Sequence, residues 1–466
     1  MKTMGSTISE YRRKLQGHER RHLRAPNSSI PLIVRIKGNV HKQNLKVAIQ
    51  KAQKRHKLLQ VRVEIDETNT AWFTTKGAEE IPCRIKERTS DDQWISICEK
   101  ESKIPFDFYK RPPLRIILLY SETTSDLILF CHHVFSDGMS VAYLARDMMM
   151  VLGNPDKELE ILPPPPVMNR ENIPDEVSKS AIVQKFIDRI NKKWKKKEIV
   201  FDHHDYLSIF NAYWNHNTHC IQIIELTEHE AEALVNKCRT EQVTVNSMIF
   251  GAFLKAQYCA KQLNKPKKQK AGVAVDVRNY LKTPPGESFG FYAAGFIDEY
   301  TFNDTIDFWE MTRRIHKKIS KKLSNNEFFV NLLRAGNLEP SIHDALIMKT
   351  YGNLVSQGDR RYDKLSEFSK KRDSVSSMAK KFGAMHFGFA VTNLGKLIFP
   401  RFYGDLELER LLVYPPTGPT IETTLFAVTV SGKLTLILSY VKDENNIVPM
   451  SQLKELLEKY LKTCCS

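Results

Sequence analysis

The chain has 466 residues, of which 42% are hydrophobic, 10% aromatic and 27% charged. This length and apolar content exceed what one ordinary core needs, so we expect a folded protein with two subdomains rather than a disordered one. No window approaches the ~18 unbroken apolar residues that a membrane-spanning helix requires. The formal net charge of +16 would suit phosphates, an acidic carrier protein, an anionic membrane or nucleic acid, or simply a well-solvated lysine-rich surface.

Cysteine use and the chain start favour a cytoplasmic location. The eight cysteines are scattered and most fall in apolar stretches, so reduced, buried thiols are expected. The first residues run into Arg12-Arg13-Lys14 without an apolar core, unlike a secretory signal. Cys464 and Cys465 could accept a lipid, but the last four residues do not fit the prenylation pattern, and we do not expect lipidation. No zinc-finger or RNA-binding motif is present, so no nucleic-acid partner is expected.

After a basic lead-in at residues 1–30, the first part of the chain alternates strand and helix patterns. We expect residues 31–165 to form an N-terminal subdomain, which the proline run 163–166 ends as a stiff connector. Apolar residues alternate in the expected strands and recur at helical spacing in the expected helices. The expected elements are strands at 31–37, 61–65, 114–120 and 127–132, and helices at 45–52 and 141–152.

Residues 166–220 are expected to be a crossover connector. Within it, residues 181–197 form an apolar stripe whose other positions are mostly lysine and arginine. Such a basic amphipathic helix can lie on an anionic membrane, but it more often packs on its own protein, so a peripheral membrane contact stays open. Two histidine groups, at 203–205 and 216–219, lack paired cysteines, and we interpret them as solvated loop residues rather than as a metal site.

Residues 221–466 repeat the alternation and are expected to form the C-terminal subdomain. Thr227 and Glu230 have the spacing of a capping box at a helix start. Because strand–helix–strand order recurs in both halves, the sequence predicts a mixed α/β fold with two similar subdomains. The expected elements are strands at 221–225, 271–278, 387–395, 425–430 and 434–440, and helices starting near 228 and 243 and covering 453–461.

Residues 127–138 join a short apolar strand to the start of a helix and carry two adjacent histidines, His132 and His133. Backbone N–H groups at a helix N-terminus lack intrahelical partners and can meet an anion, including one that develops during a reaction. A neutral His133 could act as a general base, and Gly138 would let the backbone approach a substrate closely. Asp137 could orient the imidazole or turn away and bind an arginine. Taken alone, such a histidine pair is more often structural.

The segment HHVFSDG at 132–138 resembles the HHxxxDG signature of the chloramphenicol-acetyltransferase-like superfamily. This superfamily includes peptide-synthetase condensation domains, alcohol acetyltransferases, wax-ester synthases and polyketide-associated acyltransferases. Further similarities run in family order from residue 55 to 395. They are Arg55-His56-Lys57-Leu58-Leu59 with RHxLL, Pro105-Phe106-Asp107 and Pro113-Leu114-Arg115 with PFDL…PLLR, Thr244-Val245-Asn246 with TVND, Asp276-Val277-Arg278 with DLR, and Val391-Thr392-Asn393-Leu394-Gly395 with SNLG.

The resemblance implies an α/β fold of two chloramphenicol-acetyltransferase-like subdomains in a V, with a central tunnel between them. It implies that His133 deprotonates a hydroxyl acceptor, which attacks an acyl thioester directly and forms no covalent acyl-enzyme. The donor, an acyl-CoA or a phosphopantetheine-linked acyl-carrier protein, is a substrate, and no bound cofactor or metal is implied. We therefore expect a free-standing acyltransferase.

The resemblance also assigns roles to the residues around His133. His132 is expected to be structural, and Asp137 is expected to pair with an arginine, for which Arg278 is the candidate. The Gly138 amide, at the helix N-terminus, is expected beside the oxyanion. Asn393 is expected to lie near the tunnel without a derived role.

The chain also departs from the patterns of some members. The plant-type DFGWG motif is absent, and Glu287–Tyr292 is at best a loose echo of it. The tail lacks the full wax-ester-synthase pattern. Because one such unit accounts for all 466 residues, we expect no adjoining adenylation or carrier domain. Two rival hypotheses remain. One is an amide-forming condensation enzyme with an amine acceptor, and the other is a catalytically silent member that binds a carrier or partner through the same tunnel.

Overall fold

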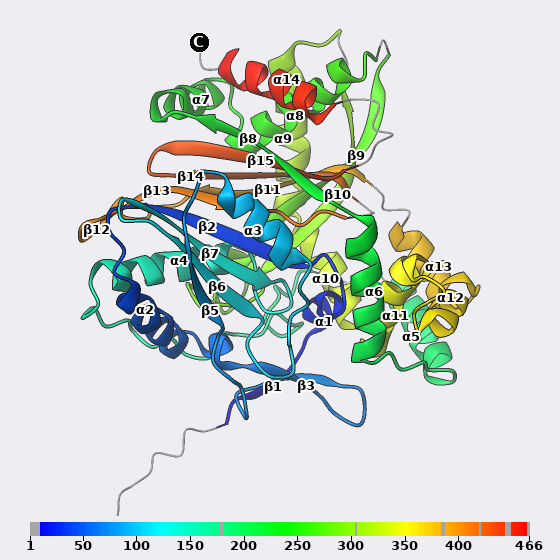
Figure 1. Ribbon diagram of the computed structural model, residues 1–466. Helices are drawn as coiled ribbons and strands as arrows, with labels where there is room; N and C mark the ends of the chain where they lie inside the picture. Colours follow the sequence, from blue (N-terminus) through cyan, green and yellow to red (C-terminus); the bar gives the residue numbers. More distant parts are fainter. Residues whose placement is uncertain are drawn as a thin grey trace, which may run out of the picture.

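A computed structural model describes residues 10–177, 181–263, 265–302, 305–383, 387–418, 421–442 and 449–463. Two six-stranded sheets lie side by side at its centre, and helices pack around them (Figure 1). In spatial order, the first sheet contains β12 (Phe402–Tyr403), β13 (Leu406–Val413), β2 (Ser29–Lys37), β7 (Thr124–His132), β6 (Leu114–Tyr120) and β5 (Cys83–Glu87). The second contains β10 (Ala293–Phe302), β9 (Lys267–Asp276), β11 (Phe387–Lys396), β14 (Ile421–Val430), β15 (Lys433–Val441) and β8 (His219–Leu226).

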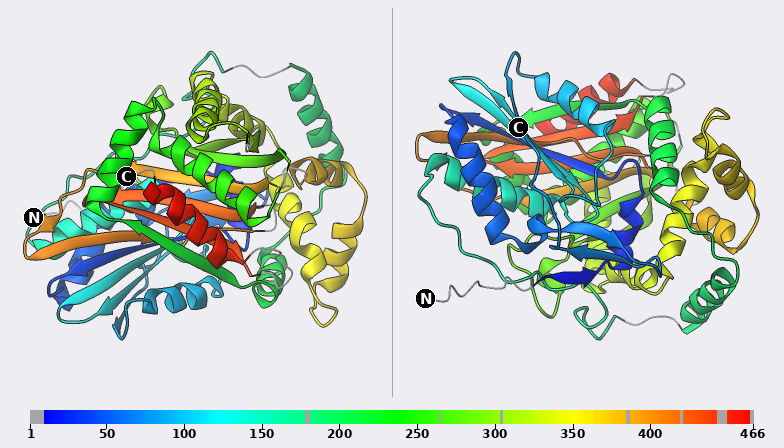
Figure 2. Two further views of the ribbon diagram at one scale, coloured as in Figure 1. Left: turned by 90° about the horizontal axis from the view of Figure 1, so that it is seen from above. Right: turned by 60° about the horizontal axis from the view of Figure 1, so that its bottom comes forward.

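Helices pack beside each sheet, and a further cluster of helices, from residues 181–216 and 340–383, lies at one end of the sheets (Figure 1). α2 packs against α4 beside the first sheet, and α8 packs against α9 and α14 beside the second (Figures 1 and 2). This arrangement confirms the predicted mixed α/β fold with two sheet-containing subdomains. The helices are α1 (Gly17–Leu23), α2 (Lys42–Arg55), α3 (Gln93–Ser102), α4 (Gly138–Gly153), α5 (Ala181–Lys195), α6 (His203–His216), α7 (Glu228–Thr240), α8 (Val245–Ala260), α9 (Phe308–Ser324), α10 (Phe328–Gly336), α11 (Pro340–Tyr351), α12 (Tyr362–Lys370), α13 (Ser374–Gly383) and α14 (Met450–Thr463). None of these described helices is long and apolar enough to span a membrane.

β7 is the central strand that leads to the predicted site. It pairs with β2 on one side and β6 on the other, and every residue from Ser125 to His132 is buried. Burial on both faces explains why its apolar run is continuous rather than alternating.

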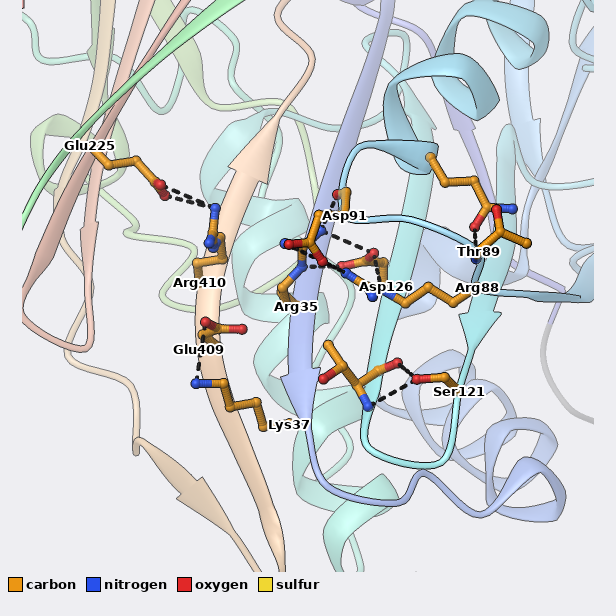
Figure 3. Close-up of polar contacts among 12 residues, drawn as sticks. Arg35, Lys37, Arg88, Thr89, Asp91, Ser121, Asp126, Glu225, Glu409 and Arg410 are labelled. Atoms are coloured by element: carbon orange, nitrogen blue, oxygen red, sulfur yellow. Dashed lines mark hydrogen bonds and ion pairs between the residues drawn. The ribbon is translucent and has the colours of Figure 1, made fainter.

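A buried ion-pair network joins β2 to β7. Arg35 lies directly opposite Asp126, and its Nε is 2.7 Å from the carboxylate (Figure 3). The Nε of Arg88 donates to the other oxygen of Asp126 at 2.9 Å. A charged pair directly across two strands favours one register, and this register places Ser29 opposite His132 at the far end of the strands.

The predicted division of the chain at residue 220 is wrong for β12 and β13. Both strands come from the expected C-terminal subdomain, but β13 pairs with β2 in the first sheet, with Leu411 opposite Val34. Ion pairs hold β13 to both sheets: Glu409 contacts Lys37 at 3.3 Å, and Arg410 contacts Glu225 of β8 at 3.1 Å (Figure 3). We call each six-stranded sheet with the helices beside it a lobe. The second half of the chain therefore helps to build the first lobe.

The predicted lead-in at 1–30 is also wrong for the residues described from 10 onward. β1 (Arg12–Lys14) pairs with β4 (Ala71–Thr74), which pairs with β3 (Arg62–Ile65) in a small third sheet. α1 packs against α10 and α11. Arg20 and Arg24 of this segment are buried and bind the buried Asp344 of α11, with Nε–carboxylate distances of 3.0 Å each.

The connector is more ordered than the sequence predicted. Residues 203–216 form α6, and His219 begins β8, so these histidines do not lie in a solvated loop. His219 is buried, with its Nε2 2.7 Å from the hydroxyl of Tyr213. α5 buries Trp194 against the protein, where its indole N–H donates to Ser341, while Ile182 at the other end is 80% exposed.

Candidate active site

A cavity of about 750 Å³ lies between the two lobes, where the resemblance implied a tunnel. His133, Gly138 and residues of β2 line it from the first lobe, and residues of β9, β10, β11 and β14 line it from the second. Most of its walls are apolar. Five of the six predicted site residues line it, namely His133, Asp137, Gly138, Arg278 and Asn393.

His133 lies in the turn between β7 and α4, and one of its two ring nitrogens is hydrogen-bonded within that turn. Its backbone N–H donates to the carbonyl of Ser28 at 2.7 Å, which fixes the turn to β2. Its Nδ1 lies 3.1 Å from the carbonyl of Ser136. Because a carbonyl can only accept, Nδ1 carries the proton and Nε2 keeps a lone pair. Burial lowers the pKa of His133 to about 4, so the ring is neutral near pH 7.

His132 faces the core instead. Its Nδ1 accepts a hydrogen bond from the backbone N–H of Val134 at 3.1 Å. Its ring packs edge-on against Phe106 and Phe108, with centroid distances of 5.3 and 4.9 Å. Burial lowers its pKa well below the ordinary value. Phe106 belongs to the PFD motif, so that motif packs against the histidine pair.

Asp137 binds Arg278 across the two lobes. The two guanidinium nitrogens contact the two carboxylate oxygens at 3.1 and 3.0 Å, a bidentate geometry. The carboxylate also caps α4 by accepting from the N–H of Ser140 at 2.8 Å, and it accepts from the N–H of Tyr292 at 2.6 Å. Although burial acts to lower it, the carboxylates of Asp137 and Asp276 raise the pKa of Arg278. The carboxylate of Asp137 thus stabilises the turn between β7 and α4, and its hydrogen-bond partners are Arg278, Ser140 and Tyr292 rather than His133.

Ser140 is a second link between the lobes that the sequence analysis missed. Its hydroxyl donates to the carbonyl of Gly290 at 2.6 Å and accepts from the N–H of the same residue at 2.9 Å. It also accepts from Arg278 at 2.7 Å. The loop that only loosely echoed DFGWG is therefore attached to the first turn of α4. The sequence feature that could have drawn attention to Ser140 is its position three residues after Asp137, in the first turn of the helix that Asp137 caps.

The RHxLL residues support the same loop from α2. Arg55 Nε lies 2.8 Å from the buried carboxylate of Asp147 in α4, and its Nη2 lies 2.7 Å from Glu287. His56 also binds Asp147, at 2.9 Å. These two residues therefore join α2, α4 and the loop that carries Gly290.

Gly138 and Asn393 lie on opposite walls of the cavity. A Cβ on Gly138 would lie 3.0 Å from a methyl group of Leu394, so the glycine allows β11 to approach closely. Gly138 is the first residue of α4, where N–H groups have no intrahelical partner. Asn393 accepts a hydrogen bond from the N–H of Gly395 at 2.7 Å, which supports a left-handed turn at φ +71°.

Three cavity residues come from α1, in the segment that the sequence analysis interpreted as a lead-in. They are His18, Arg21 and His22. The His22 ring lies 5.1 Å from the His133 ring, and its Nε2 accepts from Arg21 Nε at 3.1 Å. No apolar periodicity marks α1, because Leu23 is the one apolar side chain among its four buried residues.

Comparison with known proteins places this geometry in context. Residues 22–166 match the condensation domain family model. A stretch of 124 residues is 29% identical to nonribosomal peptide synthetase kk1B of Curvularia clavata, and one of 121 residues is 27% identical to surfactin synthase subunit 1 of Bacillus subtilis (strain 168). Each stretch is 26% of this chain but only 1% and 3% of those synthetases, so the chain spans a small part of these curated relatives.

Solved structures with the same fold cover nearly the whole chain. Trichothecene 15-O-acetyltransferase TRI3 from Fusarium sporotrichioides aligns with a TM-score of 0.63 at 13% identity, over 99% of this chain and 97% of that one. Polyketide synthase associated protein 5 from Mycobacterium tuberculosis aligns with a TM-score of 0.60 at 14% identity, over 97% and 98%. The chain therefore shares the two-lobed α/β fold of these solved structures, and the fold expected from its motifs is confirmed.

Proposed function

We propose that this protein is an acyltransferase that moves an acyl group from a thioester to a hydroxyl acceptor, with His133 as the general base. The observation that carries the proposal is the Nδ1 hydrogen bond to Ser136, which leaves the Nε2 lone pair of a cavity-lining, neutral imidazole available. The donor would be an acyl-CoA or an acyl-carrier protein, and neither acts as a bound cofactor.

The proposed reaction needs one proton relay and no covalent enzyme intermediate. Nε2 of His133 removes the acceptor O–H proton while the oxygen attacks the thioester carbonyl carbon. The tetrahedral intermediate then collapses, the C–S bond breaks, and the imidazolium returns the proton to the leaving sulfur. The products are an ester and a free thiol. The Gly138 N–H, at the start of α4, is the group that we assign to the negative oxygen of the intermediate.

The other residues position the base. Because Asp137 is fully engaged with Arg278 and backbone donors, we assign it to fixing the 133–138 turn and to joining the lobes rather than to polarising His133. His132 is assigned to packing the turn against the core.

A second candidate is amide formation with an amine acceptor. The match of residues 22–166 to the condensation domain model, and the two peptide synthetases among the relatives, favour it. The same base could remove a proton from the nitrogen of an attacking neutral amine as the new C–N bond forms, and return it to the leaving sulfur.

The test is to supply a panel of acyl-CoA and acyl-carrier donors with matched alcohol and amine acceptors and to follow free-thiol release. Products identified by mass spectrometry then separate ester from amide formation. We expect release that depends on an alcohol acceptor and on His133. Release that is equal in the wild type and His133→Ala, or none from either across a broad panel, contradicts the proposal. The second result would favour a silent, partner-binding member.

A further inference from the structure

Arg21 of α1 is a cation that faces the cavity. It lines the cavity together with His18 and His22, and its side chain is exposed there. Its Nε donates to His22 at 3.1 Å, whereas its Nη1 and Nη2 find no acceptor among the described residues. The planar, two-nitrogen edge that binds carboxylates in a bidentate way is therefore open.

The acidic residues next to Arg21 in sequence and space are engaged elsewhere. Glu19 binds Arg13 through both oxygens at 2.8 Å. Asp344 accepts a hydrogen bond from the Nε of Arg20 at 3.0 Å. No carboxylate within the described part of the chain forms an ion pair with Arg21.

The cavity itself supplies no other counterion for this guanidinium. The aspartates among its lining residues, Asp137 and Asp276, both bind Arg278. The lining histidines are neutral near pH 7, because burial lowers the pKa of His18, His133 and His343 to about 4. An arginine keeps its charge near pH 7, so this guanidinium faces the cavity as a cation without a counterion among the lining residues.

The rest of the cavity defines what else the ligand must be. Its walls are mainly apolar, and include Ile30, Leu32, Val273, Phe291, Leu332 and Phe426. A ligand that fits both features has a largely apolar body and one anionic group. We propose that Arg21 binds the carboxylate of such a substrate and is a specificity-determining residue of the site; this inference rests on the proposed function, because the ligand is taken to be a substrate of His133.

The position of Arg21 separates this role from catalysis. The guanidinium contacts His22, whose ring lies 5.1 Å from that of His133, so Arg21 is one residue away from the base. The phosphates of a CoA or carrier-bound donor are separated from the thioester by the whole pantetheine arm. The carboxylate at Arg21 therefore belongs to the acyl chain or to the acceptor.

A binding experiment tests the inference without turnover. Decanoate and decanamide share an apolar body but differ in charge, and isothermal titration gives a Kd for each. We expect the wild type to bind decanoate ~10- to 100-fold more tightly than decanamide, as for hydrogen bonds between a guanidinium and a carboxylate. Arg21→Gln should remove this preference, and Arg21→Lys should retain part of it. Arg239→Gln, at an exposed position of α7 outside the cavity lining, is the matched control and should behave as wild type.

Equal binding of the two ligands by the wild type, absence of binding by both, or a preference that survives Arg21→Gln overturns the inference. His133→Ala should keep the preference, so loss of turnover and loss of carboxylate recognition are separable. Two substrate pairs then identify the source of the carboxylate: 12-hydroxydodecanoate against dodecan-1-ol as acceptors, and 11-carboxyundecanoyl-CoA against dodecanoyl-CoA as donors. The pair whose kcat/KM ratio collapses in Arg21→Gln contains the recognised group.

Discussion

Lowering the pH from 8 to 5.5 protonates an ordinary histidine but leaves one with a pKa of about 4 almost entirely neutral. For His133, whose pKa burial lowers to about 4, the neutral fraction is still about 0.97 at pH 5.5. With the ordinary pKa of 6.5 the fraction would be about 0.09, roughly a tenfold loss of active base. The pH dependence of kcat/KM reports ionisations of the free enzyme. We therefore expect protonation of His133 to change kcat/KM by less than about 10% between pH 8 and 5.5.

The assay is a pH profile of kcat/KM with a primary alcohol acceptor, which does not titrate in this range. Folding must be monitored at every pH, because buried histidines with lowered pKa values also reduce the free energy of unfolding in acid. His18, His219 and His343 are buried with pKa values of about 4, so below pH 6.5 the unfolded chain binds protons that the folded chain does not. Each such histidine costs about 1 kcal/mol of stability by pH 5.5, and the Tm should fall accordingly.

An inflexion of kcat/KM near pH 6.5 in protein that remains folded would refute the reasoning. It would mean that the His133 ring is solvated in the working enzyme, or that another group is the base. A flat profile whose loss in acid follows unfolding, measured by tryptophan fluorescence, is the expected result.

Two carboxylates give further predictions, both measured by chemical denaturation. Asp137→Asn leaves the buried Arg278 without its bidentate partner and should lower the free energy of unfolding by about 3 to 5 kcal/mol; undiminished stability with lost turnover would instead favour direct orientation of the imidazole. Asp126→Ala removes the buried carboxylate that Arg35 and Arg88 share and leaves them only their contacts with Asp91, so it should also lower the free energy of unfolding by about 3 kcal/mol. A loss below about 1 kcal/mol would show that the pairing of β2 with β7 does not depend on this network.

The sequence was most informative where a local pattern is sufficient. The apolar run of β7 and the helical spacing of α4 located the turn that carries His133 and Asp137, and the motif match nominated Arg278 as the distant partner. These elements depend on periodicity and on short-range capping, which a single sequence displays.

Elements stabilised by distant partners were not predicted. Arg20 of α1 and Arg24, which follows it, are buried although the sequence alone suggests exposure, because the carboxylate of Asp344 binds both from more than 300 residues away. β13 joins the first sheet through pairing with β2, and no local pattern reveals which sheet a strand will enter. The cavity residues of α1, including Arg21, were missed because the sequence analysis did not predict this helix.

The most direct measurement of the central claim is the first-order rate of thiol release by His133→Ala at saturating donor and acceptor. If His133 is the general base, the rate should fall by about 10²- to 10⁴-fold while the Tm stays within a few degrees of the wild type. His229→Ala, which removes an exposed histidine of α7, should keep the wild-type rate. A His133→Ala protein that is folded and releases thiol within a few-fold of the wild-type rate would contradict the account.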